Sequence, residues 1–191
     1  FATHRRLGGF TGIDESAGGG ELAASGFLGA NDQQQATVGP GDEGGDLING
    51  AGNPGQIAKG DLDLWRFDAS TGDNISLRIG SPAFRPWLRL YGPTGVLFRE
   101  GLASGSADND TLISGRATNT GTFLVVAQSY YDSLSSPYIL HLAKMPGSYV
   151  VSPGDEGGTL ANGLATLATN ALGDLDVWTF SANSSDNIAL R

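Results

Sequence analysis

The sequence predicts an all-β protein that folds as an antiparallel, jelly-roll-like β-sandwich. Three observations support this prediction. Apolar and polar residues alternate with a period of two in several short segments, which is typical of half-buried strands. Glycine, proline, asparagine and aspartate separate these segments, as expected of turns. Finally, residues 40–78 recur at 153–191 without a gap, with 22 of 39 positions identical.

The alternating segments give the strands in order. We expect strands at 64–67, 75–79, 87–91, 96–99, 123–127 and 138–142. In the first, Trp65 and Phe67 share one face, while the intervening residues face the other way. The turn sequence at 92–95 makes its two neighbouring strands a hairpin. The shared phase of alternation predicts a core formed by Trp65, Phe67, Ile75, Leu77, Leu88, Leu90, Phe123 and Val125.

The period of the repeat, which runs from Pro40 to Pro153, has the size of a small domain rather than of a solenoid unit. We therefore expect an arm or the end of a preceding domain at 1–39, a full sandwich at 40–152 and a partial second copy at 153–191. The second copy aligns with only the first third of the sandwich. We expect it to expose apolar residues and open strand edges, which invite pairing with another chain.

Composition argues against several functions. The net charge is −9 with only 11 basic residues, which disfavours nucleic acid or anionic membrane as a partner. No apolar run approaches the roughly 18 residues that cross a bilayer. The chain has no cysteine and two histidines, of which His141 falls on the predicted solvent face of a strand. Nucleophilic and histidine-based acid–base catalysis therefore lack their usual residues, and we expect no enzymatic activity.

Several motifs together resemble the bacterial pre-peptidase C-terminal domain. They are the acidic, glycine-rich lead-in Gly41–Gly45 and the segments Gly60–Phe67, Gly72–Leu77, Leu88–Gly95, Gly121–Val126 and Tyr138–Leu142. The resemblance covers 40–145 and, as a partial copy, 153–191. It implies a β-sandwich, export to the extracellular space or the bacterial cell surface, no catalysis by the module itself, and calcium bound near the domain start.

The candidate metal ligands are acidic residues at the start of each copy. On a strand, Asp61 and Asp63 share a face, and Asp42 and Glu43 can complete a set of hard oxygen ligands for calcium. The repeat equivalents are Asp155, Glu156, Asp174 and Asp176. The alternative is that these carboxylates cap turns by accepting backbone N–H groups.

Aromatic residues form a further candidate binding surface. Trp87, Tyr91, Tyr130 and Tyr131 either form an exposed platform for a polysaccharide or protein matrix, or pack at a sheet edge.

Two functions remain open from the sequence. The first is a secreted structural subunit that pairs strands with copies of itself, head to tail, in a filament-like assembly. The alternative is a binding or spacer module of a larger exported enzyme or adhesin.

Overall fold

The computed structural model describes residues 38–39, 42–105, 108–131 and 135–191. The predicted arm at 1–39 lies almost wholly outside these residues, so its expected role stays a prediction. No helix in the described part of the chain is long and apolar enough to span a membrane.

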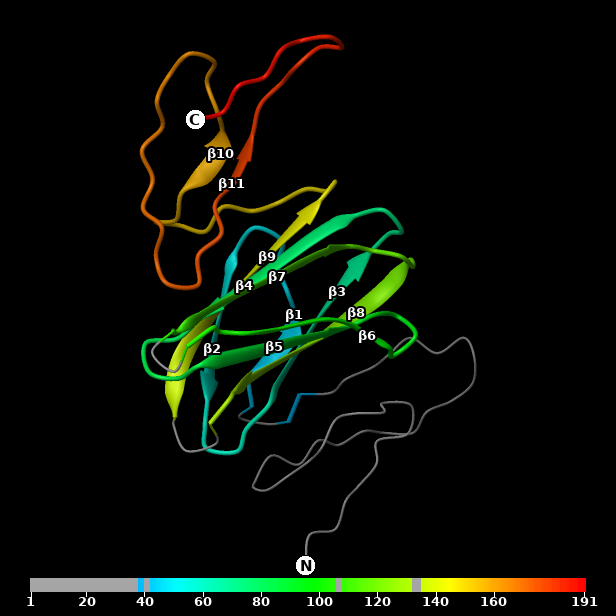
Figure 1. The fold of residues 1–191 in the computed structure, drawn as a ribbon, viewed down its shortest axis with the longest axis vertical. Coiled ribbons are helices and arrows are strands. Elements are labelled where there is room, and N and C mark those ends of the chain that lie inside the picture. The colour runs from blue at the N-terminus through cyan, green and yellow to red at the C-terminus, as the bar shows by residue number, and fades with distance from the viewer. Residues whose placement is uncertain (1–37, 40–41, 106–107, 132–134) are drawn as a thin grey trace, which may run out of the picture.

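Residues 44–145 form two β-sheets, which confirms the predicted all-β sandwich (Figure 1). One sheet contains, in spatial order, β1 (Gly44–Asp46), β3 (Asp63–Ala69), β8 (Gly121–Ser129), β5 (Pro86–Tyr91) and β6 (Leu97–Leu102). The other contains β2 (Gly52–Ile57), β9 (Ser136–Met145), β4 (Asn74–Gly80) and β7 (Asp110–Arg116). Consecutive strands change sheets at every step except from β5 to β6, which form the predicted hairpin.

The core lies between the two sheets, where the alternating apolar residues meet. All eight predicted core residues are buried. Phe67 stacks on Phe123 across the β3–β8 pair, with ring centroids 5.6 Å apart. Ile113 of β7 and Tyr138 of β9 extend the same cluster. The period-two pattern therefore identified the inward face of each strand that it detected.

Within the first copy, one strand pair departs from the predicted antiparallel arrangement. β1 runs parallel to β3, with Gly45 opposite Trp65. The reason is the intervening strand β2, which belongs to the other sheet. The chain leaves the first sheet after β1, passes through β2 and re-enters beside β1 in the same direction, as a crossover connection requires.

The second copy begins in the same way as the first. β10 (Gly157–Thr159) runs parallel to β11 (Val177–Thr179), with Gly158 opposite Trp178. This is the register of β1 and β3, displaced by one period of the repeat. The two strands form a separate small sheet at one end of the sandwich (Figure 1).

Candidate functional site: two acidic clusters and a buried histidine

The parallel pairing of β1 with β3 brings the four acids of the first copy together. Asp42 and Glu43 immediately precede β1, while Asp61 precedes β3 and Asp63 is its first residue. One carboxylate oxygen from each of the four lies within 4.8 Å of the others. The structure thus places all four predicted ligands in one cluster.

Asp63 is the buried member of this cluster. Its exposed fraction is 0%. Its Oδ2 accepts a hydrogen bond of 2.5 Å from the Tyr138 hydroxyl, whereas Oδ1 is buried without a hydrogen-bond partner. Burial, together with the nearby charges of Asp61, Glu43 and Asp42, raises the pKa of Asp63 to about 8, against the opposing effect of the Tyr138 hydrogen bond. A buried carboxyl with one orphaned oxygen calls for a proton or a cation.

Tyr138 links this carboxyl to the core. Its oxygen accepts a hydrogen bond of 2.8 Å from the Trp65 indole N–H while its own hydrogen goes to Asp63. Trp65 and Asp63 come from β3 in one sheet and Tyr138 from β9 in the other. The carboxyl is therefore held in place by a chain of hydrogen bonds that crosses the sandwich.

Asp61 fills the turn-capping role that was the alternative to metal binding. Its Oδ2 accepts the N–H of Ala58 at 3.3 Å and its Oδ1 accepts the N–H of Leu62 at 2.9 Å. For Asp42, burial, and then the charge of Asp61, raise the pKa against the opposing effect of a hydrogen bond from the backbone of Glu43. The cluster thus combines backbone capping with two carboxylates, those of Asp42 and Asp63, whose negative charge is disfavoured by their surroundings.

The second copy repeats the cluster around β10 and β11. Asp155, Glu156, Asp174 and Asp176 also offer one oxygen each within 4.8 Å of one another. Asp174 caps its turn by accepting the N–H of Ala171, just as Asp61, its equivalent in the first copy, accepts the N–H of Ala58. Burial, and then the charges of the other three acids, raise the pKa of Asp176.

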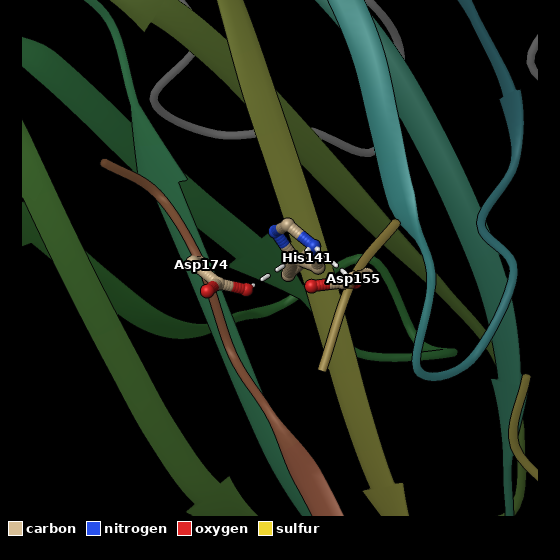
Figure 2. Close-up of side chains that lie close together, drawn as sticks. All are labelled: His141, Asp155 and Asp174. Atoms are coloured by element: carbon tan, nitrogen blue, oxygen red, sulfur yellow. Dashed lines mark ion pairs between the residues drawn. The ribbon is translucent and has the colours of Figure 1, made fainter. Parts of the chain in front are cut away.

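His141 is the residue whose environment the sequence predicted wrongly. It was expected on a solvent-exposed strand face, but its exposed fraction is 4%. The start of the second copy covers it, and Figure 2 shows the imidazole lying between the carboxylates of Asp155 and Asp174. Alternation within β9 indicates which way the side chain points, but not that residues from the next copy pack over it.

The same face of the sandwich holds a second contact with the second copy. Arg78 of β4 pairs with Asp110 of β7 at 2.8 Å and donates to the carbonyl oxygen of Asp174 at 2.7 Å. Asp110 in turn accepts the N–H of Gly173 at 3.2 Å. These residues and His141 form what we call the joint between the two copies.

The predicted aromatic surface is only partly present. Tyr91 is buried, which excludes it from an exposed platform and agrees with the packing alternative, whereas Tyr130 and Tyr131 are exposed. Trp87 packs edge-on against Tyr130, and the guanidinium of Arg85 lies over the Tyr130 ring at 4.7 Å. The exposed part is therefore a small aromatic and cationic patch where β5 begins and β8 ends.

Comparisons with known proteins concern the β fold. No protein-family model matches the chain, and no curated protein matches it significantly. Among solved structures, the pre-peptidase C-terminal domain of a Bacillus anthracis collagenase is similar at 17% identity and a TM-score of 0.45, covering 53% of this chain and 95% of that one.

PliG, a periplasmic inhibitor of g-type lysozyme, is also similar in structure. The Aeromonas hydrophila protein gives 13% identity and a TM-score of 0.43, covering 55% of this chain and 99% of that one. The Salmonella Typhimurium protein gives 13% and 0.40, covering 53% and 98%. Likenesses of this level leave the function to be argued from the residues of this chain.

Proposed function

We propose that this protein is a non-catalytic, extracellular module in which β-sandwich copies follow one another in tandem, and that the acidic cluster at the start of each copy is a cation site. The observation that carries the proposal is the buried carboxyl of Asp63, whose Oδ1 lacks a partner within a cluster of four acids. The acids recur at the same offset as the strands that position them.

Calcium suits the first cluster best. All its donors are carboxylate oxygens, and calcium takes six to eight hard oxygen ligands, from carboxylates, backbone carbonyls and water. Asp63 is held by Tyr138 with one oxygen free for a cation. A bound cation would stabilise the charged form of this carboxyl, which burial alone disfavours.

The joint supports a spacer role within a tandem chain. Arg78, Asp110 and His141 of the first copy contact the backbone or side chains at the start of the second copy. Such contacts fix the direction in which the next copy leaves the sandwich. A module with this joint would hold neighbouring domains of an exported protein at a defined spacing.

Residue chemistry supports a non-catalytic role. The chain contains no cysteine, and His141 is covered by the second copy rather than open to a substrate. The exposed patch of Tyr130 and Tyr131 is the surface we propose for contact with a polysaccharide or protein matrix, because aromatic rings stack on sugars and pack on peptides.

A calcium titration tests the main proposal. In chelator-treated protein, millimolar calcium should raise the melting temperature, because a ligand that binds only the folded state stabilises it. Asp63→Asn should abolish this rise. The matched control is Asp68→Asn, at an exposed position of the same strand. An unchanged melting temperature with calcium in the parent protein would refute the cation site.

A second candidate function is assembly through strand pairing. It is favoured by the apolar side chains that the second copy exposes, of which Leu164 is 73% and Leu167 is 93% exposed. Strands from a following segment or from a neighbouring chain could cover them. Assembly would be supported if sedimentation velocity shows that the parent chain self-associates and that the double variant Leu164→Asp, Leu167→Asp does not. If the parent chain stays monomeric at high concentration, the assembly function is refuted and the spacer function remains.

A further inference from the structure

The joint contains a site in which a histidine of the first copy faces two acids of the second. His141 lies in β9, while Asp155 precedes β10 and Asp174 precedes β11. Its Nε2 lies 3.7 Å from Asp155 Oδ2 and 3.7 Å from Asp174 Oδ1 (Figure 2). These three ligand atoms all lie within 4.8 Å of one another.

The other ring nitrogen defines how His141 is oriented. Nδ1 lies 2.7 Å from the carbonyl oxygen of Gly173. A carbonyl oxygen only accepts hydrogen bonds, so Nδ1 must carry the hydrogen. In the neutral imidazole this leaves a lone pair on Nε2, directed at the two carboxylates. An Nδ1–H donated to a backbone carbonyl is the arrangement that orients histidines whose Nε2 binds a metal.

Two of the atoms that face each other here are buried and make no hydrogen bond. His141 is 4% and Asp174 is 5% exposed, yet neither Nε2 nor Asp174 Oδ1 has a hydrogen-bond partner. The two atoms are separated by 3.7 Å. This separation is longer than a hydrogen bond to a carboxylate. A bound ion or water between them is one way to satisfy buried polar atoms that have no partner.

The spacing suits ligands of a shared cation. Zinc binds imidazole nitrogen and carboxylate oxygen at about 2.0–2.2 Å, which places two tetrahedral ligands roughly 3.4 Å apart. The observed separations are close to this value. The nitrogen donor also distinguishes the joint from the first cluster, whose donors are all oxygens, because imidazole favours zinc and similar transition cations over calcium.

We propose that His141, Asp155 and Asp174 bind a divalent transition cation of the zinc class, which fastens the second copy to the first. This inference deepens the proposed tandem-module function and rests on it for the role of the joint. The cation would neutralise the carboxylates that face Nε2 and connect β9 directly to both segments that begin the second copy. Glu156 and Asp176 belong to the acidic cluster that also contains Asp155 and Asp174.

The test uses the full chain without a histidine tag, titrated with zinc chloride by calorimetry and with cobalt(II) by visible absorption. We expect one zinc per joint and a cobalt spectrum of a four- or five-coordinate site with nitrogen and oxygen ligands. His141→Gln should weaken zinc binding at least about tenfold, since even the loss of a group that only hydrogen-bonds to a ligand has an effect of that size. The control is His4→Gln, which removes the only other imidazole in the chain.

A second variant guards against misfolding. Asp155→Asn changes a partly exposed ligand and retains an oxygen for the N–H of Glu156, which Asp155 accepts at 3.1 Å. It too should weaken zinc binding while leaving the circular dichroism spectrum unchanged. Zinc affinity within about twofold of the parent in either folded variant would overturn the proposal. The proposal would also be overturned if nitrogen-15 NMR found both ring nitrogens of His141 protonated at neutral pH and their signals unchanged by zinc.

The calcium experiment separates this proposal from the proposed function. His141→Gln should leave the calcium-induced rise in melting temperature intact, because the first cluster is formed by Asp42, Glu43, Asp61 and Asp63 alone. Loss of zinc binding with calcium binding preserved supports the joint site. If calcium raises the melting temperature of the parent protein but zinc does not bind to it, the joint site is overturned. The proposed calcium-binding module would still stand.

Discussion

Tyr138 donates its hydroxyl hydrogen to the Asp63 carboxylate at 2.5 Å, across the interface between the two sheets. Both residues are buried. The contact ties the cation-site candidate of β3 to the strand β9, whose outer face carries His141. The two candidate sites therefore share one supporting strand.

Removing this hydroxyl should destabilise the sandwich. Tyr138→Phe leaves the Trp65 indole N–H and Asp63 Oδ2 without the partner that each has now. Leaving buried polar groups unsatisfied costs about 1–3 kcal/mol each. We expect a loss of that order in the free energy of unfolding, measured by urea denaturation. Tyr131→Phe, at an exposed tyrosine, is the control and should change it by less than about 0.5 kcal/mol.

The raised pKa of Asp63 predicts a specific pH dependence of stability in chelator. The folded-state pKa is about 8 and the ordinary value is 3.8. Below 3.8 the carboxyl is protonated in both states, so Asp63 contributes no slope. Between 3.8 and 8 only the folded protein holds the proton, so unfolding releases it and stability falls as pH rises through this window. Asp63→Asn should flatten the slope across this window, and an identical slope in parent and variant would show that Asp63 is ionised in the fold.

The equivalent phenylalanines of the two copies should respond differently to truncation. Phe67 is buried and stacks on Phe123, whereas Phe180, which occupies the same place in the repeat, is exposed. Phe67→Ala should cost roughly 3–5 kcal/mol, the range for a large core aromatic. Phe180→Ala should be close to neutral. Chemical denaturation of both variants measures this, and equal losses would mean that the second copy buries its phenylalanine.

Gly173 should be sensitive to a side chain because the backbone of the sandwich lies against it. Its φ is +80°, and a Cβ there would lie 2.5 Å from the backbone nitrogen of Gly80. Gly173→Ala should therefore displace the start of the second copy. Faster hydrogen exchange at the Gly173 amide, which donates to Asp110, would report this displacement.

Gly163 provides the matched control for the joint. Its φ is +78°, but no atom lies within 4 Å of a Cβ built there. Gly163→Ala bears the same backbone cost, about 1–2 kcal/mol for an L-residue in the left-handed region, without a clash. Exchange at the Gly173 amide should be unchanged in this variant. Equal exchange rates in both variants would indicate that the joint tolerates a side chain at Gly173.

Local patterns were enough to predict several strands and the core, but not every strand. β2 has the sequence Gly-Asn-Pro-Gly-Gln-Ile and shows little apolar alternation. It forms at a sheet edge through hydrogen bonds to β9, which lies near the other end of the sandwich sequence. An edge strand tolerates proline because one of its sides needs no ladder hydrogen bonds. Such a strand depends on its distant partner, and its own sequence carries little of that information.

The sequence by itself determined the repeat, the strand faces and the grouping of acids at the start of each copy, because period-two alternation and residue spacing are local properties of the chain. The tertiary structure alone decided what covers each face. Asp63 meets Tyr138 from the opposite sheet, and His141, which points away from the sandwich core, is buried by residues of the next copy. Burial and the partners of a side chain are set by elements distant in sequence, and these in turn set its charge and its capacity to bind a cation.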